Sequence, residues 1–312
     1  MLIAALYLTH QQKRETVPPL KEGGTAANLK YGVNAIQGRR AYMEDMHQVR
    51  DLSKQENIAN ISHFFAVYDG HGGKRAAAFV REHLVDNLVA DLTTRDANVA
   101  NNPDTYDEMD ADQEFRSVCL QSWLATDGAF LQHALRNGIP DGSTAICCMI
   151  QSAPRTLRPL RLHIANVGDS RCALIRSDGS ALPLSEDHKP NRPDELSRIT
   201  AAGGQVIFAG CWRVQGDLAV SRAFGDCHLK RYGVSAEPEI TTYSIGGKDS
   251  FLVLGSDGLW DVLDEVQCAR VVLASPDDPT QAANALCELA LASGSMDNIT
   301  ALVVDLRPAN RF

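Results

Sequence analysis

Aspartates that follow apolar runs are the residues of this chain best placed to do chemistry. Asp69 comes immediately after the run 64–68, Asp257 comes soon after the run 251–254, and Asp169 follows a third apolar run. If these runs are buried strands, several carboxylates that meet at their ends need a cation between them. Mg²⁺ and Mn²⁺ prefer oxygen ligands of this kind and also bind phosphate. The pattern therefore predicts a divalent-metal site.

The Asp-Gly dipeptide supports this interpretation only in its context. It occurs at residues 69, 127, 141, 178 and 257, and by itself it is typical of an ordinary turn. The first and the last of the five follow an apolar run. Two more acidic segments could complete the site, namely Glu44-Asp45 and Asp297-Asn298. Spacing along the chain does not prove that these segments converge.

Composition narrows the class of protein. A chain of 312 residues, 44% hydrophobic and 22% charged, can bury a large core, and its net charge of -9 argues against a nucleic-acid partner. The apolar run 2–8 is too short to span a membrane. The eight cysteines contain no Cys-x-x-Cys pair, so we expect reduced thiols in a cytoplasmic or nuclear protein rather than zinc or disulfides. We expect a monomer.

Periodicity predicts the elements that would position these residues. Apolar, β-branched or aromatic runs predict strands at 64–68, 144–150, 162–167, 172–176, 251–254 and 299–305. Helical periodicity predicts helices at 74–89, 114–135, 193–202, 265–274 and 280–292. Because the helices flank blocks of strands rather than alternating with them, we expect an α+β fold of antiparallel sheets covered by helices, not a doubly wound parallel sheet.

The organisation of the chain is simple. Residues 1–27, with Pro18-Pro19 and Gly23-Gly24 among polar residues, indicate a flexible lead-in. Residues 28–308 show no boundary and predict a single domain. The polar, acidic stretch 93–113 has no periodicity, and we expect a surface loop there.

Seven segments, in order, resemble the motifs of the type-2C, metal-dependent serine/threonine protein phosphatases, and together they extend over residues 31–306. They are Arg40-Ala-Tyr-Met-Glu-Asp45, Val67-Tyr-Asp-Gly-His-Gly-Gly73, Gly142-Ser-Thr-Ala145, Asn166-Val-Gly-Asp-Ser-Arg171, Leu218-Ala-Val-Ser-Arg-Ala-Phe-Gly-Asp226, Gly255-Ser-Asp-Gly-Leu-Trp-Asp-Val262 and Gly294-Ser-Met-Asp-Asn-Ile-Thr300. The resemblance implies a β-sandwich of two antiparallel sheets with helices on both sides.

The resemblance also assigns ligands for two Mg²⁺ or Mn²⁺ ions at one edge of that sandwich. By resemblance, Asp69 bridges the two metals, Gly70 offers its carbonyl oxygen to one of them, and Asp257 and Asp297 hold the other. Glu44 and Asp45 act mainly through metal-bound waters. Asp169 and Asp261, with Asp257, match the residues of a weaker third metal site.

The chemistry implied is hydrolysis of phosphoserine or phosphothreonine in a phosphoprotein by a two-metal-activated water, without a covalent phosphoenzyme. By resemblance Arg40 binds the phosphate, and His71 protonates the departing alkoxide. Residues 187–228 resemble the family's flap, in which Arg213 is a second candidate for phosphate binding. Without the motifs around them, Arg40 and Arg213 could equally form ordinary surface ion pairs, and His71 could simply be a loop histidine.

Other chemistries can be tested against the sequence directly. None of the eight cysteines has an arginine six residues later, which disfavours a thiolate nucleophile. Asp45-Met46-His47 imitates the start of a calcineurin-like metallophosphoesterase, but the later Gly-Asn-His is missing. A catalytically inactive pseudophosphatase that binds or scaffolds other proteins stays the rival hypothesis. Its mark would be a lost ligand aspartate, and every assigned side-chain ligand here is acidic.

Overall fold

The structure is a computed structural model that describes residues 20–26, 29–54, 58, 60–101, 108–152 and 159–307. Residues 1–19 of the expected lead-in lie outside this part. Within the described residues, no helix is both long enough and apolar enough to cross a membrane.

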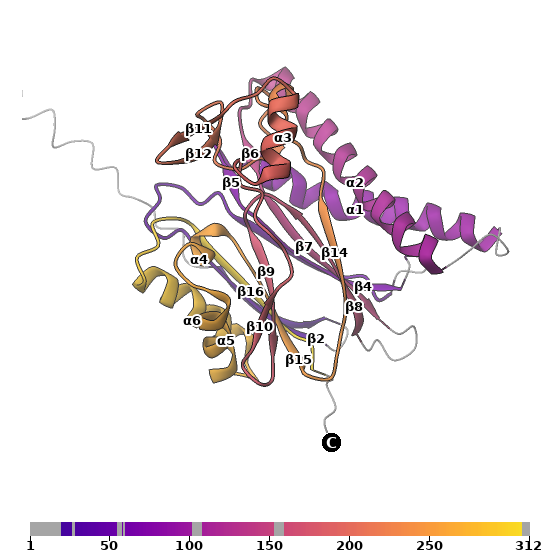
Figure 1. The fold of residues 1–312 in the computed structure, drawn as a ribbon. Coiled ribbons are helices and arrows are strands. Elements are labelled where there is room, and N and C mark those ends of the chain that lie inside the picture. Colours follow the sequence, from indigo (N-terminus) through magenta and orange to yellow (C-terminus); the bar gives the residue numbers. More distant parts are fainter. Residues whose placement is uncertain are drawn as a thin grey trace, which may run out of the picture.

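Two antiparallel sheets, each built from strands distant in sequence, lie face to face (Figure 1). The six-stranded sheet has the order β1 (Leu20–Ala26), β2 (Leu29–Ile36), β16 (Ile299–Asp305), β15 (Asp249–Gly255), β9 (Arg171–Arg176), β10 (Ala181–Pro183). The five-stranded sheet has the order β14 (Glu239–Ser244), β8 (Pro159–Val167), β7 (Ala145–Ser152), β4 (Ile61–Tyr68), β3 (Met46–Asp51).

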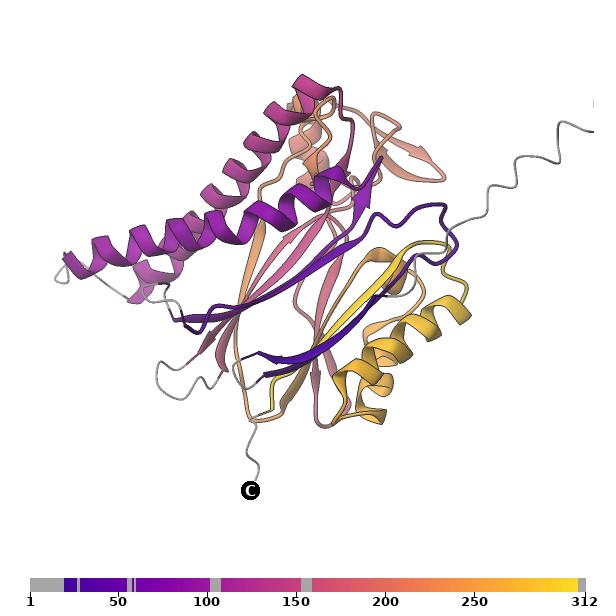
Figure 2. The ribbon, with the colours of Figure 1, turned by 180° about the vertical axis from the view of Figure 1, so that it is seen from behind.

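Helices cover the outer face of each sheet, so the expected α+β sandwich is confirmed (Figure 2). The five-stranded sheet is covered by α1 (Arg75–Asn101) and α2 (Glu108–Asn137), and the six-stranded sheet by α5 (Glu265–Ala274) and α6 (Pro279–Ala292). Each of the predicted strands and helices lies within an observed element of the same type or differs from it by one residue at an end.

Burial on both faces explains why the central strands are continuous apolar runs. In β4, Phe64, Ala66 and Tyr68 pack in the cluster that contains α1 and α2, whereas Phe65 and Val67 pack in the cluster between the two sheets. Successive side chains of a strand point to opposite faces, so a strand with helices on one side and a sheet on the other has no polar face.

Smaller elements lie above one end of the sandwich. The flap region contains α3 (Pro193–Ala201) and a hairpin of β11 (Val206–Ala209) and β12 (Cys211–Val214). A short sheet has the order β13 (Phe224–Gly225), β6 (Gly142–Ser143), β5 (Gly70–His71), and a short helix, α4, spans Asp257–Trp260.

Two expectations about flexible segments were wrong. Most of the expected loop 93–113 is helical, because α1 and α2 continue past the core and Arg95 of α1 bonds Glu114 of α2 at 3.1 Å. Part of the lead-in, residues 20–26, is strand β1, in which Gly23 pairs with Gly32 of β2. The sequence pattern missed both elements for different reasons. Ion pairs stabilise the polar helix ends, which lack apolar periodicity, and backbone hydrogen bonds stabilise the strand that contains the glycine pair.

A buried histidine predicts how stability depends on pH. His163 of β8 is 4% exposed and packs on Phe115 of α2 with ring centroids 4.3 Å apart. Burial, together with the charges of Arg161 and Arg116 and against the attraction of Asp112, lowers the pKa of His163 to about 4. The unfolded chain, with a histidine pKa of about 6.5, then binds more protons between these values. The free energy of unfolding therefore falls as pH falls from about 6.5 to 4.

We expect His163→Gln to reduce the fall between pH 7 and pH 5 by about 2 kcal/mol, measured by urea denaturation at these two pH values. The matched control is His133→Gln, which removes an exposed histidine. A parent-like pH dependence in His163→Gln would contradict the assignment.

Candidate metal centre

The connectivity of the strands brings the predicted aspartates to one edge of the sandwich. Strands β4 and β8 are both antiparallel to β7, so they run in the same direction and end at the same edge, followed by Asp69 and Asp169. The end of β15, just before Asp257, lies beside the start of β16, just after Asp297. Residues 168–170 connect β8 of one sheet to β9 of the other, which joins both sheets at this edge.

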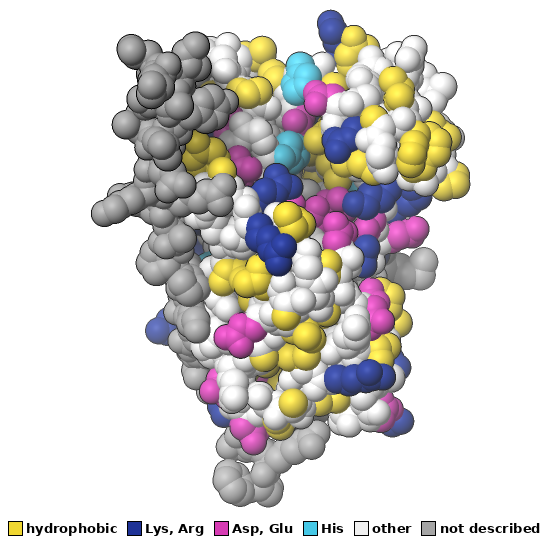
Figure 3. All heavy atoms as spheres, turned by 90° about the vertical axis from the view of Figure 1, so that its left-hand side faces the viewer, with side chains coloured by type: hydrophobic (Ala, Val, Ile, Leu, Met, Phe, Trp, Pro, Cys, Tyr) yellow, Lys and Arg dark blue, Asp and Glu magenta, His cyan; other side chains and the backbone are white. Residues whose placement is uncertain are grey.

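Mutual repulsion shows that these carboxylates lie near one another. Burial, followed by the charges of Asp257, Asp45, Asp169 and Asp297, raises the pKa of Asp69 well above its usual value. Burial and the charges of Asp169, Asp297, Asp261 and Asp45 also raise the pKa of Asp257. Figure 3 shows acidic and histidine side chains gathered with Lys and Arg side chains in a hollow of this face.

Two carboxylate oxygens of this group lack a donor, which is the observation that fits a cation. Asp45 is 4% exposed, and its Oδ2 accepts bonds of 2.7 Å from Ser256 and from Thr300. Its Oδ1, like Oδ1 of Asp257, is buried without a hydrogen-bond partner in the described residues. Burial raises the pKa of Asp45 to about 6. Oxygen donors of this type suit Mg²⁺ or Mn²⁺.

The side chains do not form a ligand cage by themselves. Among the described residues, no three His, Cys, Asp or Glu side chains are arranged so that they could hold a metal ion alone. Mg²⁺ is usually bound by one or two carboxylates with waters, so such a cage is not required for it.

Asn298 connects the acidic loop before β3 to the start of β16. Its Nδ2 donates to the carbonyl oxygens of Gln37 and Tyr42 at 2.8 and 2.9 Å, and its Oδ1 accepts from the Glu44 amide at 2.8 Å. Arg40 of the same loop forms an ion pair with Asp297. The structure thus places the predicted phosphate-binding arginine beside a predicted metal ligand.

His71 has a partner that the sequence did not identify. Its Nε2 lies 2.7 Å from Oδ2 of Asp226, whose side chain is 5% exposed. Burial lowers the pKa of His71, but the hydrogen bond and the charge of Asp226 outweigh burial, and the net shift is upward. Gly142 lies against this pair, because a Cβ there would be 2.0 Å from the Asp226 carboxylate and 2.2 Å from Nε2. The position of Asp226 after the short strand β13 was the available signal.

The three other predicted positions, Asp169, Asp261 and Arg213, differ in their surroundings. Asp169 is buried and forms an ion pair with Lys189, a residue that the sequence did not single out. Asp261, directly after α4, is exposed as a whole residue. Its carboxylate is partly buried, and this burial and the charge of Asp169 raise its pKa against the attraction of Lys189. The Arg213 guanidinium donates to the Asp217 carbonyl oxygen at 2.5 Å, within its own loop. The structure therefore shows no contact of Arg213 with the described carboxylates.

An antiparallel two-sheet sandwich with acidic strand ends at one edge defines a recognisable class, and comparison identifies it. The chain belongs to the protein phosphatase 2C family, whose sequence model, described as "Protein phosphatase 2C", matches residues 29–299. Similar curated proteins include "Probable protein phosphatase 2C 7" of Oryza sativa, 39% identical over 88% of this chain and 65% of its own length. "Probable protein phosphatase 2C 69" of Arabidopsis thaliana is 39% identical over 96% of this chain and 77% of its own length.

This chain spans less than two-thirds of the length of some of these relatives, 65% of one and 50% of another. Solved structures share its fold. A serine-threonine phosphatase 2C from Toxoplasma gondii has a TM-score of 0.78 at 22% identity and covers 92% of this chain and 99% of its own. A C. elegans sex-determining protein has a TM-score of 0.74 at 26% identity and covers 90% of this chain and 66% of its own.

Repulsion at the metal centre predicts a trade between stability and metal binding. Asp69→Asn removes one charge from the buried group, so we expect the variant to be more stable than the parent in chelator, by about 1–3 kcal/mol or roughly 2–6 °C in Tm. Added Mn²⁺ should raise the Tm of the parent but not that of the variant. Thermal denaturation in both buffers measures this.

The matched control is Asp86→Asn, which removes an exposed carboxylate paired with Arg50 at 3.1 Å and should change Tm little. A lower Tm for Asp69→Asn in chelator would contradict the proposed repulsion.

Proposed function

We propose that this chain hydrolyses phosphoserine and phosphothreonine in proteins with the help of bound Mg²⁺ or Mn²⁺. The proposal rests on a group of mutually repelling carboxylates at one edge of a protein phosphatase 2C sandwich. Two carboxylate oxygens of this group are buried without a hydrogen-bond partner in the described residues. Residues 28–308, together with strand β1, would form the catalytic domain, with residues 187–228 as its flap.

The proposed ligands of two ions are the Asp69 and Asp257 carboxylates, the Gly70 carbonyl oxygen and Asp297, with Glu44 and Asp45 reached through water. Bound divalent ions lower the pKa of a water and stabilise charge on phosphate oxygens. Asp45 supports the site from within, because hydrogen bonds from Ser256 and Thr300 fix one of its oxygens and leave the other unpaired.

Phosphate binding is proposed for Arg40. Its side chain is 56% exposed at the acidic edge, and a guanidinium presents a planar pair of donors that matches phosphate oxygens. The attraction of Asp297 outweighs burial and raises the Arg40 pKa, so the guanidinium stays charged. A guiding role for Arg213 rests on its place in the flap, and would require it to leave the Asp217 carbonyl.

His71 is proposed to protonate the leaving serine or threonine oxygen. The hydrogen bond to Asp226 fixes the ring orientation and favours the protonated, positively charged imidazole. Departure of an alkoxide needs a proton, so a proton donor held in a fixed orientation would contribute directly to the rate.

Metal dependence tests the proposal as a whole. The protein should hydrolyse a phosphothreonine peptide with Mn²⁺ or Mg²⁺, lose this activity in chelator and regain it with excess metal. Asp257→Asn should lower kcat/KM at least about 100-fold while circular dichroism shows a folded protein, because it removes a ligand from the surface of the core. A folded parent that binds Mn²⁺ without turnover would favour the pseudophosphatase.

The positioning role of Asp226 has its own test. Asp226→Asn should lower kcat on a phosphothreonine peptide about 10- to 100-fold with little change in KM. Gly142→Ala should do the same, since its methyl group displaces the His71–Asp226 pair. On p-nitrophenyl phosphate, whose leaving group needs no proton, both effects should be much smaller. Equal losses on both substrates would indicate a structural role instead.

A further inference from the structure

The Lys189–Asp169 ion pair lies where the weaker third metal is expected. Lys189 Nζ bonds Oδ2 of Asp169, whose side chain is 6% exposed. Asp261 lies close enough to interact electrostatically with both Lys189 and Asp169. Its charge raises the pKa of Lys189, and the charge of Asp169 raises the pKa of Asp261. An ammonium group therefore already neutralises the carboxylate that a third cation would use.

Backbone contacts fix the position of Lys189. The preceding residue, His188, is fully buried, and its amide and ring Nδ1 bond the carbonyl oxygen and amide of Gly168 at 2.9 and 3.0 Å. The carbonyl oxygen of His188 accepts from both the amide and the hydroxyl of Ser221 at 2.8 Å. Because Gly168 precedes Asp169, these bonds fix Lys189 beside that carboxylate. The pair is part of the fold rather than a loose surface contact.

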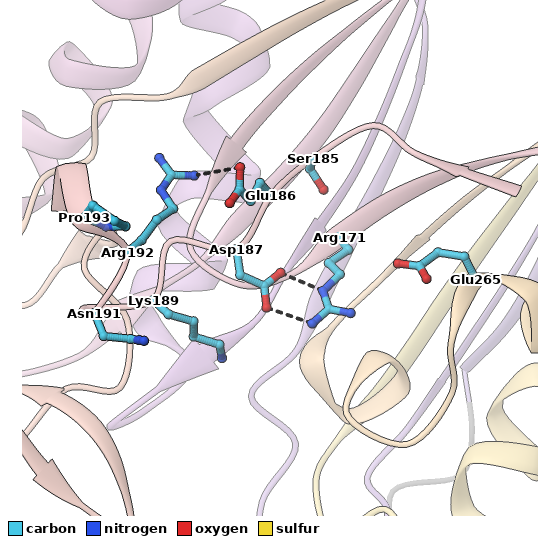
Figure 4. Close-up of a pocket in the computed structure, with 9 residues that line it drawn as sticks. All are labelled: Arg171, Ser185, Glu186, Asp187, Lys189, Asn191, Arg192, Pro193 and Glu265. Atoms are coloured by element: carbon cyan, nitrogen blue, oxygen red, sulfur yellow. Dashed lines mark hydrogen bonds and ion pairs between the residues drawn. The ribbon is translucent and has the colours of Figure 1, made fainter. Parts of the chain in front are cut away.

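Lys189 borders a cavity into which its side chain could move. Lys189 lines a pocket of about 480 Å³ with Asp187, Glu265 and other residues (Figure 4). Asp187 is held by Arg171 through bonds of 2.6 and 2.8 Å, whereas the Lys189 side chain is 39% exposed and borders the same pocket. Displacement of its ammonium from Asp169 therefore does not bury an unpaired charge.

We propose that Lys189 is a built-in competitor of the third divalent cation, which must displace the lysine ammonium from Asp169 in order to bind. This inference rests on the proposed metal-dependent function. Of the carboxylates proposed to hold the first two ions, only Asp297 has an ion pair in the described residues, with Arg40, so we expect these ions to bind more tightly than the third. The third position then fills only at high metal concentration.

Direct binding of Mn²⁺, followed by isothermal titration calorimetry and by the electron paramagnetic resonance signal of free Mn²⁺, tests the competition without an activity assay. Lys189→Gln should tighten the weakest Mn²⁺ binding step at least about 10-fold and leave the tighter steps nearly unchanged. Adding Asp169→Asn to Lys189→Gln should remove that step. Lys248→Gln is the matched control, because this exposed lysine pairs with Asp178 elsewhere and its loss should change nothing.

Lys189→Arg keeps the charge and should bind the weakest Mn²⁺ as the parent does. Equal affinity in the parent and Lys189→Gln would overturn the proposal, and so would equal tightening by Lys189→Arg and Lys189→Gln, which would indicate a steric effect. A parent that binds no Mn²⁺ at all would instead refute the proposed function, together with the inference that depends on it.

Discussion

Repulsion between carboxylates at one edge of the sandwich is the constraint on which the rest of the structure depends. Folding brings Asp69, Asp257 and Asp45 together although the charges of Asp257 and Asp45 raise the pKa of Asp69, and that of Asp45 also raises the pKa of Asp257. Such an arrangement persists only because the core beneath it is large, with strands buried on both faces and fully buried side chains such as Phe64 and Phe65. The stability of this core offsets the cost of an acidic edge.

The same constraint explains which positive charges surround the edge. Arg40 pairs with Asp297 and Lys189 with Asp169, so two of the acidic residues have a side-chain counter-ion. Asp69 and Asp257 have no ion pair in the described residues, and these are the positions proposed to contact the ions most directly. Side-chain cations thus neutralise some carboxylates of this edge, and the unpaired Asp69 and Asp257 are the groups for which a metal counter-ion is proposed.

The fold could be predicted well because its central strands are uninterrupted apolar runs, a pattern that the two-sided burial of β4 requires. The expected loop at 93–113 was wrong because ion pairs such as Arg95–Glu114 stabilise polar helix ends that have no apolar period. Strand β1 was not predicted for a similar reason, since its backbone pairing with β2 requires no particular side chains.

Within the site, residues at strand ends could be predicted and their partners could not. Asp69 and Asp257 stand out in the sequence because an apolar run comes before each of them. The sequence gives no sign of which residues Asp226 and Lys189 contact, since each contact joins residues that are not neighbours in the chain. Only the three-dimensional structure brings Asp226 to His71 and Lys189 to Asp169.

The flap illustrates how a buried charge can fix such partners. Burial raises the pKa of Glu195, but hydrogen bonds from Arg198, Arg222 and Ser221 outweigh it and hold that pKa well below its usual range. Ser221 also bonds the carbonyl oxygen of His188, the neighbour of Lys189. Hydrogen bonds thus link Glu195 in the first turn of α3 to Ser221 and Ser221 to the His188 carbonyl oxygen, and His188 precedes Lys189 in the chain, so these contacts help to place the ammonium beside Asp169.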